Sequence, residues 1–194
     1  MNYRITSARR LIAVAAAAVA GLGISSAAYA ATSTPTARAA ATIPACSGGV
    51  GTGISAWVAI DQGNGAAGTI YYPLEFTNTS RHTCSLYGYP GVSAISRTGQ
   101  QLGSPAGRGS LSGAKRVILA PGATAHTILA YHDAAVSTSS GCHPVESTFD
   151  LRVYLPGQRV ATDAAFDFDV CSHPGVVYMN IVEPITAGVG TING

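Results

Sequence analysis

The sequence is 194 residues long, with 11 Lys and Arg against nine Asp and Glu, and only 10% of its residues are charged. Nucleic-acid-binding domains gather basic residues on one face, whereas Lys115–Arg116 is the only adjacent basic pair after residue 30. The composition therefore argues against a nucleic-acid partner.

Residues 1–30 have the pattern of a secretory signal peptide. A basic start is followed by an apolar run at 11–24 and by small residues at positions −3 and −1 of a cleavage site after Ala30. A membrane-spanning helix needs roughly 20 apolar residues, so the pattern predicts a secreted, extracellular protein that is cleaved between Ala30 and Ala31 and has no stable membrane anchor. Lipoproteins have a Cys at the first mature position, where Ala31 stands here. The Arg9–Arg10 pair leaves both Sec and twin-arginine export open.

The remainder divides into a linker and one domain. Residues 31–45 are rich in Ala, Thr and Pro and poor in large apolar side chains, so we expect a flexible linker. Residues 46–194, about 150 in number, are enough to bury the core of a single domain.

Within this domain, short β-rich runs alternate with turn sequences such as Tyr89-Pro90-Gly91 and Pro156-Gly157. No segment keeps a helical period for long. Many short strands at this spacing predict an all-β fold, an immunoglobulin-like antiparallel β-sandwich. The candidate strands are 54–60, 70–77, 85–88, 92–96, 114–119, 124–131, 149–155, 165–170 and 176–182.

The run 70–77 shows the clearest alternation. The face expected to meet the core carries Ile70, Tyr72, Leu74 and Phe76. The opposite face carries Tyr71, Glu75 and Thr77. Pro73 cannot donate to a ladder, so it predicts an edge strand or a bulge. Trp57 lies in the first strand, and its face stays unassigned.

All four cysteines lie after residue 30, at Cys46, Cys84, Cys142 and Cys171. An even number in an exported protein predicts disulfides, and we favour Cys46–Cys84 and Cys142–Cys171 because each bridge links nearby segments. The alternative is a zinc site that adds His143 and His173 as ligands. The usual C-x₂-C spacing is absent and the compartment is oxidising, so we expect two disulfides and no metal or cofactor.

Two motifs have simpler explanations than the functions they suggest. Residues 63–68 fit G-x-G-x-x-G, but they lead into a strand where a dinucleotide site needs a helix, so we expect a glycine-rich hairpin loop. Residues 78–80 (Asn-Thr-Ser) form an N-glycosylation sequon, and we expect them instead to end a strand, with side chains bonded to nearby backbone.

Candidate chemistry is sparse. Asp163, Asp167 and Asp169 form the densest acidic group and could bind Ca²⁺ or serve as an acid/base pair. Phe166, Phe168 and Val170 alternate with them toward the core, so a solvated strand face explains them equally well. There is no G-x-S-x-G elbow. The histidines are scattered and have no metal-ligand spacing, at positions 82, 126, 132, 143 and 173. Four tyrosines could stack on a sugar or peptide, namely Tyr71, Tyr87, Tyr89 and Tyr131.

The stretch 76–92 (FTNTSRHTCSLYGYPGV), with 119–133, 151–157 and the four cysteines, resembles an actinobacterial secreted family known only as domain of unknown function 4232. The resemblance runs from about Cys46 to Pro184. It implies a fold and a location at or outside the cell envelope. It implies no chemistry and no functional residues.

These observations favour an exported, non-enzymatic β-sandwich module that binds an extracellular or envelope protein or a glycan. The alternative is a secreted hydrolase that uses the acidic cluster with a histidine. A carboxylate and a histidine in one concave pocket would favour the hydrolase. An exposed acidic face distant from any histidine would count against it.

Overall fold

A computed structural model describes residues 42–49, 53–132, 145–171, 175 and 177–192. The predicted signal peptide with its cleavage site at Ala30 and Ala31, the linker residues 31–41, and Cys142, His143 and His173 lie outside the described residues. The described part is all-β apart from the 3-10 turn η1 (Ile60–Gln62). It contains no helix that could span a membrane.

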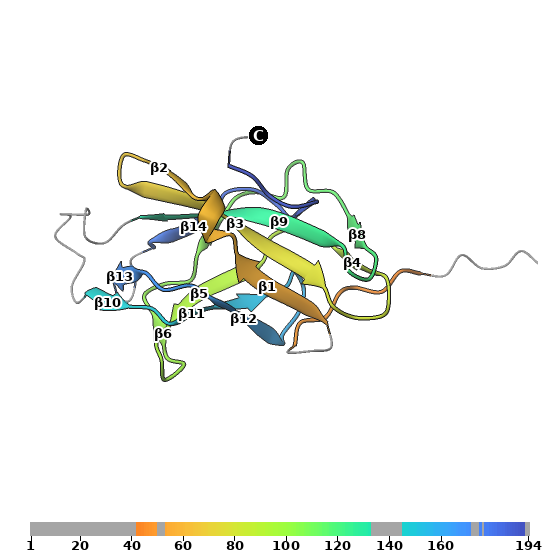
Figure 1. Cartoon of the computed structure of the whole chain (residues 1–194), viewed down its shortest axis with the longest axis horizontal. Coiled ribbons are helices and arrows are strands. Elements are labelled where there is room, and N and C mark those ends of the chain that lie inside the picture. Colours follow the sequence, from red (N-terminus) through yellow and green to blue (C-terminus); the bar gives the residue numbers. More distant parts are fainter. Residues whose placement is uncertain (1–41, 50–52, 133–144, 172–174, 176, 193–194) are drawn as a thin grey trace, which may run out of the picture. The chain divides into compact units, whose positions relative to one another are not determined.

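The larger sheet has seven strands (Figure 1). Its main path is β1 (Ile54–Val58), β3 (Thr69–Asn78), β9 (Thr124–His132), β14 (Met179–Ile181) and β7 (Gly107–Arg108). Two short strands add to it, β2 (Asn64–Ala66) on β3 and β15 (Thr186–Ala187) on β9. All pairs are antiparallel except β14–β7.

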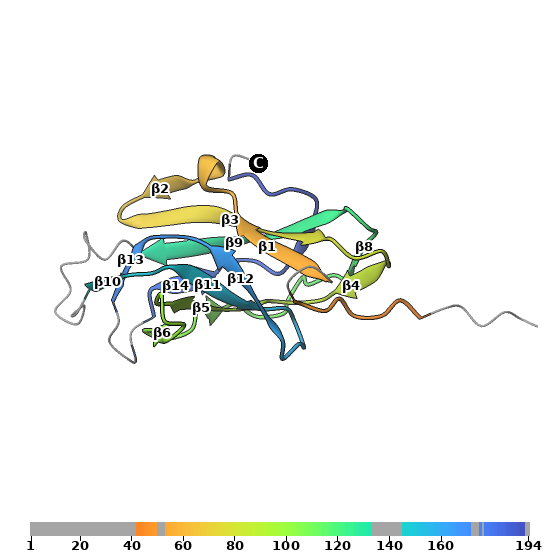
Figure 2. The same ribbon diagram turned by 60° about the horizontal axis from the view of Figure 1, so that its bottom comes forward.

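The second sheet is antiparallel, in the order β12 (Ala161–Ala165), β11 (Asp150–Tyr154), β5 (Gly91–Ile95) and β6 (Gln101–Leu102). Two further strand pairs stand apart from these sheets, β10 (Val145–Ser147) with β13 (Asp169–Cys171) and β4 (Cys84–Leu86) with β8 (Val117–Leu119). Figure 2 shows the two larger sheets as separate layers.

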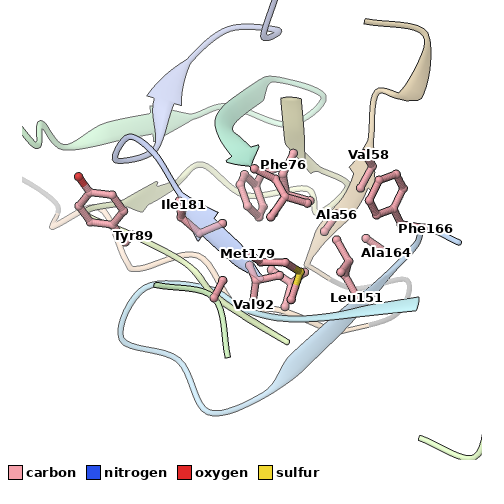
Figure 3. Packing of buried hydrophobic residues seen from close by; sticks show 14 of the residues in the cluster. Ala56, Val58, Phe76, Tyr89, Val92, Leu151, Ala164, Phe166, Met179 and Ile181 are labelled. Carbon is pink, nitrogen blue, oxygen red and sulfur yellow. The ribbon is translucent and has the colours of Figure 1, made fainter. Parts of the chain in front are cut away.

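One hydrophobic core joins the two larger sheets (Figure 3). Phe76 and Met179 from the first sheet and Leu151 and Val92 from the second are all fully buried. Burying an aliphatic or aromatic side chain of this size stabilises a fold by about 1.5–3 kcal/mol. The core therefore depends on the alternation within β3, β11 and β14, which sends one side of each strand inward.

β3 confirms the apolar face that alternation predicts and corrects two expectations. Leu74 and Phe76 are fully buried as expected, but Glu75, expected on the outer face, is also 0% exposed, because the chain near Gly190 covers it. Pro73 does not mark an edge strand or a bulge, since β3 lies between β9 and the β1/β2 side. Pro73 lies between the residues of β3 that pair with β1 and those that pair with β2, so its missing N–H interrupts neither set of ladder hydrogen bonds. Its carbonyl accepts a hydrogen bond of 3.0 Å from Ala59 N–H.

The predicted strand 165–170 is wrong as a single element. β12 begins earlier, at Ala161, and ends at Ala165, and β13 begins at Asp169. The alternation nevertheless holds across the interruption, because Phe166 and Phe168 are buried and Asp167 is exposed. The chain crosses here from the second sheet to the β10–β13 pair. Buried and exposed side chains therefore continue to alternate between Ala165 and Asp169, where the backbone is paired with neither strand.

The disulfide Cys46–Cys84 is present, and the two Cα atoms are 4.8 Å apart. It joins β4 to the segment before β1, and a hydrogen bond of 2.9 Å from Cys46 N–H to Ser85 O lies beside it. Cys171 is fully buried in β13. Its predicted partner, Cys142, falls outside the described residues, so the second bridge stays a prediction.

Candidate functional site

Four aromatic rings cluster at one end of the core. Tyr72 of β3 stacks on Tyr131 of β9 with ring centroids 6.2 Å apart, and Phe166 meets both rings edge-on at 5.1 and 5.9 Å. Phe168 completes the cluster at 4.7 Å from Phe166. Offset and edge-to-face pairs each add about 0.5–1.5 kcal/mol beyond the area that they bury. The cluster therefore makes a firm base for the surface above it.

The surface above this cluster is an open groove of about 700 Å³. Side chains from both larger sheets and from the β10–β11 connection line it, among them Ile60, Tyr72, Arg97, Ser147, Phe149 and Asp167. The Arg97 guanidinium lies 4.4 Å from the centroid of the Phe149 ring. Phe149 is 45% exposed, so a cation and an apolar ring face are presented together. We call this cavity the Arg97–Phe149 groove.

Thr148 joins two segments that line the groove. Its buried hydroxyl donates to Phe166 O at 2.7 Å and accepts from Phe168 N–H at 3.2 Å. Its own N–H donates to Phe168 O, and the next residue, Phe149, donates to Ile95 O, both at 2.9 Å. One residue thus ties the crossing segment 166–168 to the β10–β11 connection that carries Phe149.

The groove combines aromatic surface with hydrogen-bonding groups of both kinds. Arg97 supplies up to five N–H donors and Asp167 an exposed carboxylate. Ser147 lies beside them, and its hydroxyl donates to Asp169 Oδ1 at 2.8 Å. Ligand sites typically pair an apolar lining with a few such polar groups.

The three aspartates are exposed, as predicted, and they do not form one acid/base site. Asp163 lies 3.9 Å from Arg152, and Asp169 is bonded to Ser147, so only Asp167 faces the groove. No hydrogen bond or ion pair joins any of them to a histidine in the part of the chain that the structure describes. The distances to His143 and His173 fall outside the described residues.

A buried carboxylate that the sequence pattern does not indicate lies on the outer side of β3. Glu75 Oε1 accepts a hydrogen bond of 2.8 Å from Gly190 N–H, and Oε2 is buried with no hydrogen-bond partner among the described residues. Burial raises the pKa of Glu75, while the Gly190 hydrogen bond and the charge of His126 act in the opposite direction. His126, paired with Glu75 in register, has Nδ1 at 2.8 Å from Gly188 O and Nε2 at 3.6 Å from Glu183 Oε1. The C-terminal segment covers this group, so it presents no surface to a ligand.

The four candidate tyrosines do not share one binding surface. Tyr131 and Tyr89 are buried, and the Tyr89 hydroxyl donates to Ser110 O at 3.0 Å. Tyr87 is 50% exposed, and Tyr71 is half-buried on β3. Trp57, whose face stayed unassigned, is 41% exposed, and its Nε1–H donates to Thr77 Oγ1 at 3.4 Å.

Both simple motif interpretations are confirmed. The glycine motif lies in a hairpin as expected and starts no helix, but residues 64–66 form the strand β2 and only residues 67–68 form the turn into β3. At the end of β3, the Asn78 amide donates to His82 O and Leu119 O, both at 2.9 Å, and the Ser80 hydroxyl donates back to Asn78 Oδ1 at 2.7 Å. Asn78 is fully buried in this structural role.

Nothing in the sequence marks Arg97 or Phe149 as part of a site. They lie 52 residues apart, and neither stands in a motif, so only the pairing of β5 with β11 brings them together. No curated protein and no solved structure matches the chain. Residues 55–178, most of the domain just described, match a family of undefined activity. The chain therefore belongs to the family described as Domain of unknown function (DUF4232).

Proposed function

We propose that this protein is an exported, non-enzymatic binding module with an immunoglobulin-like β-sandwich fold, and that it holds a glycan in the Arg97–Phe149 groove. The observation that carries the proposal is the stacked pair in the lining of the groove, in which the Arg97 guanidinium lies over the half-exposed Phe149 ring. The family and the fold leave the ligand undefined, so the proposal stands on this geometry.

The chemistry of the groove suits a polyhydroxylated ring. The apolar face of a sugar can lie on aromatic surface, and its hydroxyls both donate and accept hydrogen bonds. Phe149 and Tyr72 supply the aromatic surface, Arg97 supplies donors, and Asp167 supplies an acceptor.

The disulfide Cys46–Cys84 is consistent with an extracellular protein, since such bridges persist in oxidising compartments. Export also agrees with the basic and apolar pattern of residues 1–30. The alternative hydrolase gains no support, because the described histidines and the three aspartates are not joined in a pocket. Among the described residues that line the groove, Asp167 is the only carboxylate, whereas general acid–base hydrolysis requires two such groups.

Calorimetric titration tests the proposal. We would titrate the protein with cellotetraose, chitotetraose and soluble peptidoglycan fragments, and repeat the series with Arg97→Ala and Phe149→Ala. Loss of the stacked ring or of the guanidinium should weaken binding by about tenfold, the cost of roughly 1.4 kcal/mol of contact. Tyr87→Ala is the matched control, because Tyr87 is similarly exposed, at 50% against 45% for Phe149, and is not among the residues that line the groove.

Failure of all three glycans to bind would overturn the glycan assignment, and an equal loss from Phe149→Ala and Tyr87→Ala would overturn the assignment of the groove. The non-enzymatic part has a separate test. Each glycan is recovered after prolonged incubation and its chain length measured by mass spectrometry. We expect no shortening, and any shortening that Asp167→Asn abolishes would restore the hydrolase.

A further inference from the structure

Two hollows adjoin each other beside the turn that joins β11 to β12. The first, of about 390 Å³, is lined by Gly91 of β5 and by its register partner Tyr154 of β11. The second, of about 330 Å³, is lined by Tyr87 and Leu111. Four residues line both hollows, namely Tyr89, Arg108, Pro156 and Gly157. We call the two hollows together the Tyr87–Tyr154 groove.

Exposed apolar side chains lie in both hollows. Tyr154 is 37% exposed in the first hollow, and Tyr87 and Leu111 are 50% and 55% exposed in the second. Pro105 adds an exposed ring to the first hollow. Single apolar side chains are ordinary at a protein surface, whereas a group of them in one depression is typical of a site that contacts a ligand or a partner.

Hydrogen bonds fix the walls of this groove. The Tyr89 hydroxyl donates to Ser110 O at 3.0 Å, which holds the buried ring that both hollows share. Gln158 N–H donates to Leu155 O at 2.9 Å and closes the turn that carries Pro156. A site whose shape is already formed loses little conformational entropy when it binds.

Arg108, in β7, is the one charged side chain among the described residues that line either hollow. It is exposed, and its guanidinium forms no ion pair or hydrogen bond with another residue in the described part of the chain. The amides of Gln101 and Gln158 line the first hollow. The groove therefore offers one unpaired positive charge and several N–H and O–H donors, with no carboxylate in its described lining.

A proline-rich segment has the complementary chemistry. It adopts the polyproline II conformation, which has no internal hydrogen bonds, so its carbonyl groups need donors while its prolines have no N–H to satisfy. Its rings are apolar, and segments of this kind dock in grooves lined by aromatic side chains. An acidic residue within the segment can pair with the free guanidinium of Arg108.

A sugar fits the second hollow less well than it fits the Arg97–Phe149 groove. Sugar hydroxyls both donate and accept, and no Asp, Glu, Asn, Gln, Ser or Thr is among the described residues that line this hollow. Its polar side-chain groups are Arg108 and the hydroxyls of Tyr87 and Tyr89, and the Tyr89 hydroxyl already donates to Ser110 O. A sugar in this hollow would replace few of the hydrogen bonds that it makes with water.

The length of the groove suits a short segment. The Cα atoms of Tyr87 and Gly91, four positions apart in the sequence, are separated by at most about 14 Å. Pairing of Gly91 with Tyr154 adds about 5 Å. At about 3.1 Å per residue, a polyproline II segment of about seven residues spans this distance.

We propose that the Tyr87–Tyr154 groove is a docking site for a proline-rich segment of a partner protein that carries an acidic residue. The prolines pack on the exposed rings of Tyr87 and Tyr154, and the acidic side chain pairs with Arg108, which lines both hollows. Tyrosine hydroxyls and glutamine amides donate to the carbonyl groups of the segment. The site is independent of the Arg97–Phe149 groove, since the two have no described lining residue in common.

The probe is a terminally blocked peptide, Pro-Pro-Pro-Glu-Pro-Pro-Pro, added to the protein in a calorimetric titration. A peptide with Gln in place of Glu should bind about fivefold more weakly, the upper range for an exposed ion pair. A peptide with Lys at that position should bind at least about tenfold more weakly, because it brings two cations together. Replacement of every proline by Ala should also weaken binding by about tenfold or more, since a flexible chain must be ordered when it binds.

Variants of the protein locate the site. Arg108→Gln should bind the Glu and Gln peptides equally within about twofold, because the charge that distinguishes them is gone. Tyr154→Ala should weaken binding of the Glu peptide by about tenfold, and Tyr87→Ala should weaken it too while glycan binding stays unchanged. Trp57→Ala is the matched control, since Trp57 is 41% exposed against 37% for Tyr154 and is not among the lining residues of either hollow. If Tyr154→Ala does not fold, Arg108→Gln and the peptide series still decide.

The proposal is overturned if the Glu peptide does not bind, or binds no better than the Lys peptide. It is also overturned if Arg108→Gln keeps the preference for Glu over Gln, or if Tyr154→Ala and Trp57→Ala weaken binding equally. Displacement of the peptide by chitotetraose would make this groove a glycan site instead, and a dimer in ultracentrifugation that Tyr154→Ala dissolves would assign it to a second copy of the chain.

Discussion

Thr148 offers the sharpest test of how the groove is built. Its hydroxyl is the partner of two buried backbone groups, Phe166 C=O at 2.7 Å and Phe168 N–H at 3.2 Å. Thr148→Val keeps the shape of the side chain and removes both hydrogen bonds. Leaving one buried polar group unsatisfied costs about 1–3 kcal/mol, so two predict a loss of about 2–6 kcal/mol in the free energy of unfolding.

The matched control is Thr148→Ser, which keeps the hydroxyl and removes one methyl group. That variant should cost only about 0.8 kcal/mol. Urea denaturation gives both values, and amide exchange at Phe168 should report local loosening in Thr148→Val alone. If Thr148→Val is as stable as Thr148→Ser, these hydrogen bonds do not hold the crossing segment, and the account of the groove wall is wrong.

Three further results should follow from the described contacts. Burial raises the pKa of Glu75 above its usual 4.5, so the folded state binds this proton more tightly than the unfolded chain. The contribution of the protonated carboxyl to the free energy of unfolding is therefore full below pH 4.5 and is lost as the pH rises through the raised pKa. In a series of denaturation curves, the stability of Glu75→Gln minus that of the wild type should grow with pH over this range, and a constant difference would refute the shift. Ala67 has a φ of +52° in the turn from β2 to β3, so Ala67→Asn should raise stability by about 0.5–1 kcal/mol and increase Tm, whereas a lower Tm would mean that the turn is not strained. Replacing Cys46 and Cys84 together by Ala should cost about 4 kcal/mol on the chain-entropy model for a separation of 38 residues, and a calorimetric loss below about 1 kcal/mol would count against that model here.

Alternation predicts the inner faces of the strands and fails where a distant segment covers an outer face. It places Leu74 and Phe76 in the core correctly, because period 2 depends only on the local backbone. It places Glu75 in solvent, since nothing near β3 in the sequence reveals that Gly190 packs there, 115 residues away. Burial by a sequence-distant segment is a tertiary fact that no local pattern contains.

The candidate site shows the same division. Exposure of Asp167 follows from its place between Phe166 and Phe168, so the sequence predicts that carboxylate correctly. The role of Arg97 depends on the register of β5 with β11, in which Ile95 pairs with Asp150 and brings the two strand ends together. A sequence without a motif at either position gives no warning of such a pairing.

The groove itself results from a change of sheet. β12 is paired with β11 as far as Ala165, and the chain then leaves the second sheet to join the β10–β13 pair at Asp169. In an uninterrupted sheet, residues 166–168 would bond to a neighbouring strand, and no hollow would form beside them. Here Thr148 takes over those backbone bonds with its own N–H and hydroxyl, so the segment stays ordered while Asp167 faces an open space. One buried threonine therefore satisfies the backbone groups that lose their strand partners at the crossing. Arg97 and Phe149 line the space beside this crossing.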